Sequence, residues 1–81
     1  MTTNSIKLTI DQRYLLARTS AAGENGVLIE NRSTAGNALI RKRLAIKTLS
    51  RETAEGIRGQ AARLYATDAG HDWIISNGVG G

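Results

Sequence analysis

The sequence contains no cysteine, and its 81 residues include one histidine, one tryptophan and two tyrosines. Without cysteine, neither a disulfide nor a thiolate zinc site can form, which is compatible with a reducing compartment. No apolar run approaches the roughly 20 residues needed to cross a bilayer, and the first residues lack the apolar segment of a signal peptide. We therefore expect a cytoplasmic protein with no membrane partner, no metal and no other cofactor.

The length of the chain predicts a single domain. A domain of this size buries only about 60% of the surface that its unfolded chain exposes, so the core must be compact. The sequence has no internal repeat and no interdomain linker. We expect one domain over residues 1–81, with residues 1–6 and 77–81 as flexible termini.

Positive charge is concentrated in the middle of the chain. The net charge is +4, and residues 31–63 carry eight lysines and arginines against two glutamates. Residues 1–30 are balanced, and residues 64–81 carry two aspartates and no cation. A cationic segment between neutral or acidic flanks is typical of a polyanion-binding protein. A solvated surface with a chance excess of arginine remains the alternative.

The first helix is predicted over residues 10–22. Thr9 and Gln12 form the pattern of a capping box, and Gly23 suits the end of a helix. Four apolar residues repeat at helical spacing, Leu15 and Leu16 widen their stripe, and this stripe is expected to face the core: Ile10, Tyr14, Ala17 and Ala21.

The remaining pattern predicts an α+β domain. The apolar run 27–29 is too short to classify, and a second helix follows Asn31 or Ser33, either of which can cap it. A strand is expected at 44–46 and a return strand at 63–66, while 47–62 reads as an exposed hairpin or loop. Thr67 is expected to cap a last helix that starts directly after the return strand.

Three segments together resemble bacterial winged helix-turn-helix proteins. "YATDAGHDWI" is similar to their strand-to-helix junction Y-x-L-T-x-A-G-x-x-h, where h is apolar. "NALIRKRLAI" resembles the end of their recognition helix, and "LTIDQRYLLAR" resembles their opening helix. The resemblance covers roughly residues 8–76. It implies a small winged helix-turn-helix fold, in which the helices pack with a two- or three-stranded β-hairpin wing.

The resemblance also implies a function, which is sequence-specific binding of double-stranded DNA by a small bacterial or phage transcriptional regulator. The recognition helix, about residues 33–43, would enter the major groove, and a basic wing over 47–62 would lie on the backbone. A homodimer is the expected state because one small domain makes few contacts. Base contacts are expected from Asn31, Arg32, Ser33, Thr34 and Asn37; phosphate contacts from Arg41, Lys42 and Arg43; and wing contacts from Arg51 and Arg58.

Other functions remain open at this point. The same fold can serve as a protein-interaction module, such as a phage-encoded inhibitor of a host CRISPR-type nucleoprotein complex. RNA binding fits the charge, but the scarcity of aromatic residues disfavours it. Asp68, His71 and Asp72 could hold a metal, although such residues are commoner as solvated surface. No buried nucleophile–histidine pair is indicated, so no catalytic residue is predicted and the chain is not expected to be an enzyme.

Overall fold

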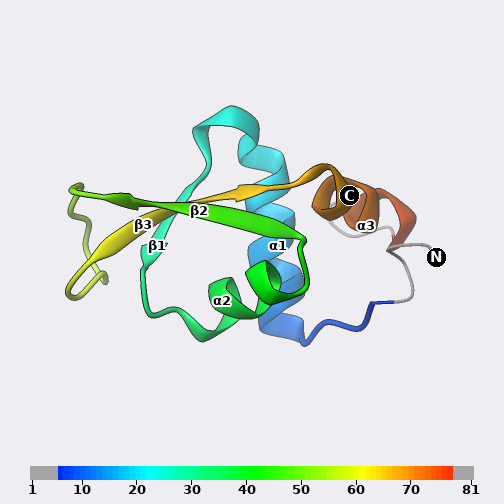
Figure 1. Cartoon of the computed structure of the whole chain (residues 1–81), viewed down its shortest axis with the longest axis horizontal. Coiled ribbons are helices and arrows are strands. Elements are labelled where there is room, and N and C mark those ends of the chain that lie inside the picture. Colours follow the sequence, from blue (N-terminus) through cyan, green and yellow to red (C-terminus); the bar gives the residue numbers. More distant parts are fainter. Residues whose placement is uncertain (1–5, 78–81) are drawn as a thin grey trace.

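The computed structural model describes residues 6–77 and shows a small α+β domain with three α-helices and a three-stranded antiparallel sheet. In Figure 1 the β2–β3 hairpin projects at one end of the elongated molecule and α3 lies at the other. The strands are ordered β1-β3-β2 in the sheet. The elements are α1 (Ile10–Ala22), the 3-10 turn η2 (Gly23–Asn25), β1 (Val27–Glu30), α2 (Thr34–Arg41), β2 (Ala45–Ser50), β3 (Ala61–Ala66) and α3 (Asp68–Asn77).

The termini predicted to be flexible lie mostly outside the described residues. Their two innermost positions are ordered. Ile6 packs against the core, and its carbonyl oxygen accepts a hydrogen bond of 2.8 Å from Trp73 Nε1. Asn77 is the last residue of α3, and its Nδ2 donates to Trp73 O at 2.8 Å. Positions 6 and 77 thus each make a hydrogen bond with Trp73, one at either end of the described residues.

Helix α1 has the predicted bounds and the predicted cap. Thr9 Oγ1 accepts from Gln12 N at 3.2 Å, and Gln12 Oε1 accepts from Thr9 N at 3.2 Å. The helix ends at Gly23, whose φ of 58° is readily adopted by glycine.

Only part of the predicted stripe of α1 faces the core. Leu16 is fully buried and Leu15 packs against the core, whereas Ile10 is 82% exposed and Tyr14 is 67% exposed. The prediction was wrong for Ile10 and Tyr14 because α1 carries apolar residues on both sides, so periodicity alone could not choose between them. Thr19, which was not in the predicted stripe, is also fully buried. Thr19 is tolerated in the core because its hydroxyl donates to Leu15 O at 2.7 Å.

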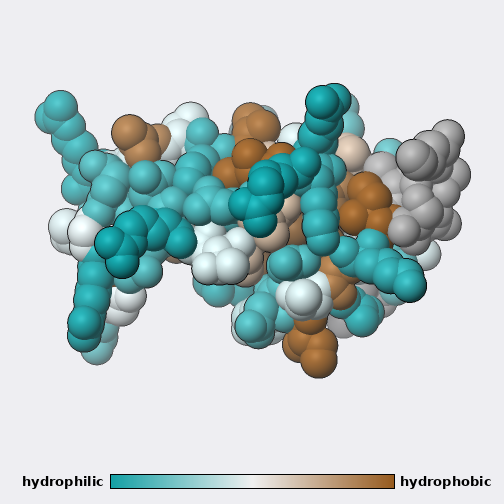
Figure 2. Space-filling view, turned by 60° about the horizontal axis from the view of Figure 1, so that its bottom comes forward, coloured by the Kyte–Doolittle hydropathy of each residue, from teal (hydrophilic) through white to brown (hydrophobic). Residues whose placement is uncertain are grey.

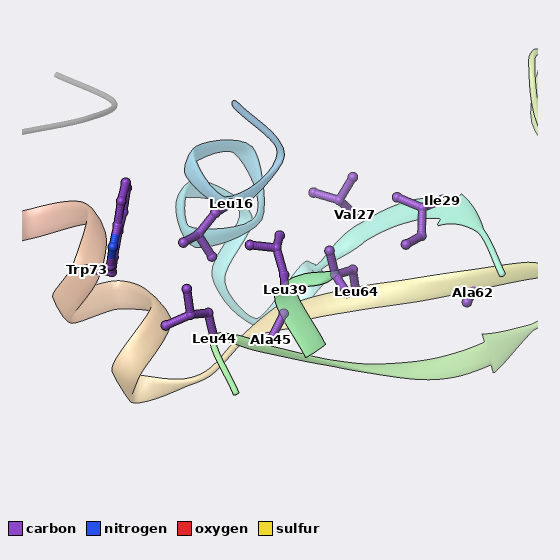
Figure 3. Close-up of a cluster of buried hydrophobic side chains, with 9 residues drawn as sticks. All are labelled: Leu16, Val27, Ile29, Leu39, Leu44, Ala45, Ala62, Leu64 and Trp73. Carbon is purple, nitrogen blue, oxygen red and sulfur yellow. The ribbon is translucent and has the colours of Figure 1, made fainter. Parts of the chain in front are cut away.

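The core lies where α1, α2 and α3 meet the sheet. Figure 3 shows leucine side chains from separate elements converging there, with Trp73 of α3 at one end of the cluster. The unclassified run 27–29 is β1, and β3 pairs with both other strands, so Leu64 lies opposite Val27 on one side and Lys47 on the other. The buried cluster comprises Leu16, Val27, Ile29, Leu39, Leu44, Ala45, Ala62, Leu64 and Trp73.

Helix α2 is bounded by local hydrogen bonds at both ends. At its start, Ser33 Oγ accepts from Gly36 N at 3.1 Å. At its end, Arg43 N donates to Ile40 O at 2.9 Å and Leu44 N donates to Leu39 O at 3.0 Å. These two bonds form a Schellman motif, in which Arg43 takes the left-handed position with a φ of 63°. The chain thereby reverses from α2 into β2.

Strand β3 runs into α3 without a loop because Thr67 makes the connection itself. Thr67 Oγ1 accepts from Gly70 N at 3.1 Å, which caps α3, and donates to Arg43 O at 2.8 Å. Thr67 N also donates to Leu44 O at 3.1 Å. A Cβ on Gly70 would collide with the Leu44 carbonyl oxygen, so glycine lets α3 pack directly on the start of β2.

Residues 47–62 form a hairpin. The β2–β3 ladder extends to the pair Ser50–Ala61, and Gln60 Nε2 closes it with a bond of 2.7 Å to Ser50 O. Residues 51–60 make the connection between the strands and contain no helix. Of the two interpretations of residues 47–62, a hairpin or a loop, the structure therefore shows the hairpin.

Candidate nucleic-acid interface

Of the ten residues predicted to contact DNA, six are exposed and four are half-buried. The exposed residues are Arg32, Thr34, Arg41, Arg43, Arg51 and Arg58. The half-buried residues are Asn31, Ser33, Asn37 and Lys42, and each makes a hydrogen bond inside the domain. The structure thus separates the predicted set into an exposed group of five arginines and Thr34, and a half-buried group bonded inside the domain.

Asn37 and Asn31 are held by Lys47. The Lys47 Nζ donates to Asn37 Oδ1 at 2.6 Å and to Asn31 O at 2.7 Å. Asn37 Nδ2 in turn donates to Asn31 O at 3.3 Å. This network ties β2 to α2 and to the turn before it, and it occupies the amide oxygen that Asn37 would use to accept from an adenine.

Ser33 and Lys42 also act inside the domain. Ser33 supplies the cap of α2, as one of the two sequence interpretations had it. Lys42 Nζ donates to Lys7 O at 2.9 Å and lies 3.5 Å from Gln12 Oε1, which connects the end of α2 to α1. Both side chains therefore stabilise the position of α2.

Gly36 is explained by close packing within the protein. A Cβ at this position would lie 2.6 Å from Ile29 Cδ1, a distance that real contacts do not show. Glycine at this position allows α2 to pack directly against the Ile29 side chain of β1. Ile29 is therefore the residue that approaches the backbone of α2 closely at Gly36.

Arg32 and Arg58 are brought together although 26 positions separate them in the sequence. Asn31 N donates to Gln60 O at 2.8 Å, and Arg58 N donates to Glu30 Oε1 at 2.8 Å. These bonds join the turn before α2 to the end of the hairpin. Both arginines then line one open pocket of about 360 Å³, with Glu30, Asn31, Gly59 and Gln60 as its other walls.

A second group of exposed residues lies along α2. Thr34 and Arg41 are seven positions apart and therefore share one face of the helix, and Arg43 follows just beyond its end. Figure 2 views the side of the molecule on which α2 lies and shows long hydrophilic side chains projecting from it. Arg51 lies farther out, in the hairpin connection, where it lines a separate pocket with Gly59 and Gln60.

Arg63 contributes less positive charge than the sequence suggests. Its guanidinium lies 2.6 Å from the Glu52 carboxylate and also donates to Asn25 O at 2.9 Å. The hydrogen bond from Arg63 lowers the pKa of Glu52, and a bond from Ser50 acts in the same direction. Strand register indicates the internal use of Lys47, which faces the buried Leu64 across the sheet, but it places Arg63 opposite Thr48 and gives no signal for the pair with Glu52.

The predicted alternative chemistry finds no geometric support in residues 6–77. These residues contain no group of three or more histidine, cysteine, aspartate or glutamate side chains that could hold a metal. His71 instead lies against α1, with its Nδ1 2.6 Å from Ser20 Oγ. No helix in the described part of the chain is long and apolar enough to cross a membrane.

Comparison of the chain with protein-family models, with curated proteins and with solved structures finds no match. The function is therefore argued from the surface just described.

Proposed function

We propose that this domain binds double-stranded DNA through the exposed arginines around α2 and the hairpin. The observation that carries the proposal is the convergence of Arg32 and Arg58 on one open pocket beside the start of α2. A guanidinium presents a planar fork of N–H donors that matches the oxygens of a phosphate. Two such groups at one pocket make a favourable site for a single backbone phosphate.

The proposed binding is governed by phosphates more than by bases. The Ser33 and Asn37 side chains are engaged inside the domain, and Asn31 is half-buried with its backbone carbonyl oxygen in the same network, which leaves Arg32 and Thr34 as the exposed residues near the start of α2. Phosphate contacts set affinity and register but carry no direct sequence information. We therefore propose DNA binding with a modest sequence preference, suited to a small regulator of bacterial or phage type.

The proposed fold is a reduced winged helix. A helix, a strand, a helix and a β-hairpin follow one another, and a closing helix starts off the hairpin, which is compatible with this fold. Within residues 6–77 only one helix, α2, stands between β1 and β2, so it takes the place of the recognition helix without a preceding partner. The hairpin takes the place of the wing.

The test is duplex affinity as a function of salt. Each phosphate contact contributes about −0.9 to the slope of log K against log salt concentration. Five arginines, two of which share one phosphate, would contact four phosphates and give a slope of about −3.6. We expect the double variant Arg32→Ala/Arg58→Ala to reduce the slope by about 1, and each single variant to weaken binding with a smaller change in slope. If both side chains hold one phosphate, the double variant loses less affinity than the sum of the single variants.

Arg13→Ala is the matched control, because it removes the same charge from an exposed position on α1. It should leave the slope within about 0.3 of the wild-type value. If Arg13→Ala and Arg58→Ala changed the salt slope equally, the salt dependence would come from net charge alone. That result would contradict a defined DNA-binding surface. Absence of duplex binding at low salt would overturn the proposal.

A second candidate is a protein-interaction module, and the Lys47–Asn37–Asn31 network favours it. This network uses the polar groups that would otherwise read bases, while the arginines remain available to an acidic surface. A domain that fails to bind DNA but binds an acidic protein complex in a manner dependent on Arg32 and Arg58 would support this candidate.

A further inference from the structure

Helix α1 presents an apolar stripe to solvent. Ile10 is 82% exposed, Tyr14 is 67% exposed, Ala21 is exposed and Ala17 is half-buried. The opposite side of the helix fills the core through Leu16 and Thr19. In Figure 1, α1 lies behind the strands and α2, so its outer side is separate from the exposed face of α2.

The order of residues in this stripe is self-complementary. Its four members are spaced by four, three and four positions, so the pattern has the same spacing in either direction. When two copies of α1 pair antiparallel about a two-fold axis, Ile10 of one copy lies opposite Ala21 of the other, and Tyr14 lies opposite Ala17. Each large side chain then meets a small one, which is the arrangement that lets helices approach closely.

The charges beside the stripe fit the same pairing. Asp11 and Arg18 are seven positions apart and both exposed, so they lie on the same flank of the stripe. A two-fold axis perpendicular to both helices reverses the direction of the second helix but brings the same flank of the two copies to the same side of the contact. Asp11 of one copy then lies level with position 20 of the other, about 3 Å along the axis from Arg18 of that copy. Two Asp11–Arg18 pairs close the two ends of the contact.

We propose that α1 pairs with α1 of a second copy of this chain, in an antiparallel contact formed by Ile10, Tyr14, Ala17 and Ala21. Thirteen residues give a helix about 20 Å long and about 10 Å wide. The footprint is therefore on the order of 200 Å² per copy, well below the roughly 800 Å² per partner of a tight complex. A contact of this size supports only a weak dimer, which we expect to form at high protein concentration.

Sedimentation equilibrium of the free protein tests this contact without DNA, so its result is independent of the DNA-binding proposal. We expect a monomer–dimer equilibrium in the wild type and at least about a tenfold weaker association for Tyr14→Glu. Ser76→Glu adds the same charge at an exposed position of α3 and should leave association unchanged. A wild type that stays monomeric at about 1 mM, or a Tyr14→Glu variant that associates like the wild type, overturns the proposal.

A charge exchange tests the direction of the helices. Asp11→Arg places two cations near each other at both ends of the contact, and Arg18→Asp places two anions there, so each single variant should weaken association. The double variant D11R/R18D restores opposite charges and should recover it. Circular dichroism confirms that each variant is folded. Failure of the double variant to recover association contradicts the antiparallel register.

Discussion

Thr67 and Arg43 are joined by a hydrogen bond of 2.8 Å, in which the Thr67 hydroxyl donates to the Arg43 carbonyl oxygen. The same hydroxyl accepts from Gly70 N and caps α3. One side chain thus starts the last helix and attaches it to the corner between α2 and β2. The position of the proposed DNA-binding helix is coupled in this way to the end of the hairpin.

Thr67→Ala should lower the free energy of unfolding by about 1–3 kcal/mol, because it removes a helix cap and a tertiary hydrogen bond together. Thr67→Ser keeps the hydroxyl and should retain most of this stability. Urea unfolding followed by circular dichroism measures both changes. Equal stability of the two variants would mean that the hydroxyl contributes nothing to this junction.

Gly36→Ala should change the free energy of unfolding by less than about 1 kcal/mol, because the Cδ1 that its Cβ would meet is the movable end of the Ile29 side chain and alanine is the better helix former. Ile29→Val removes that methyl group. Combined with Gly36→Ala, it should therefore cause less loss than the sum of the two single changes. Additive losses in urea unfolding would show that the two positions are not in contact.

Asn37→Ala should reduce stability by about 1–3 kcal/mol, because Lys47 Nζ would lose its Asn37 acceptor in a half-buried position. Duplex affinity of the folded variant should change by less than about twofold, since Asn37 is bonded internally. Thr34→Ala, at an exposed position on α2, should alter stability by less than about 0.5 kcal/mol. A stable Asn37→Ala variant with lost DNA affinity would return Asn37 to the base-contacting role that the sequence suggested.

Two substitutions of Arg43 distinguish the effect of backbone strain from the effect of charge. With its φ of 63°, Arg43→Gly should be more stable than Arg43→Ala by about 1 kcal/mol, because only glycine adopts this conformation without strain. Both variants lose the same charge and should weaken duplex binding equally. Thermal unfolding and salt-dependent affinity measure the two effects. Different affinities for the two variants would show that backbone geometry, in addition to charge, determines the DNA contact.

Glu52 should make the stability of the hairpin pH-dependent. Its pKa in the folded protein is lowered by hydrogen bonds from Arg63 and Ser50. The stabilisation is therefore fully present above the ordinary carboxyl pKa of about 4.3, and it is lost as the pH falls through the lower folded value. The Tm difference between wild type and Glu52→Gln should vanish at low pH. A difference that persists under acid conditions would exclude the charge as its source.

The sequence by itself determined the features that depend on neighbours within about four residues. The capping box of Thr9 and Gln12, the end of α1 at Gly23 and the cap at Thr67 are i to i+3 or adjacent effects. The residue types involved are chemically specific for these roles, so they are readable in one dimension. The bounds of α1 and the direct start of α3 after β3 follow from them.

Only the tertiary structure decided which face of each element is used. Nothing local distinguishes the Leu16 side of α1 from the Tyr14 side, because both are apolar and the choice depends on what packs against them. Likewise, Asn37 and Lys42 have the chemistry of DNA contacts until Lys47, Lys7 and Gln12 approach them from distant parts of the chain. The chemistry of a side chain limits the hydrogen bonds that it can make, and the long-range packing of the chain determines which partner it bonds.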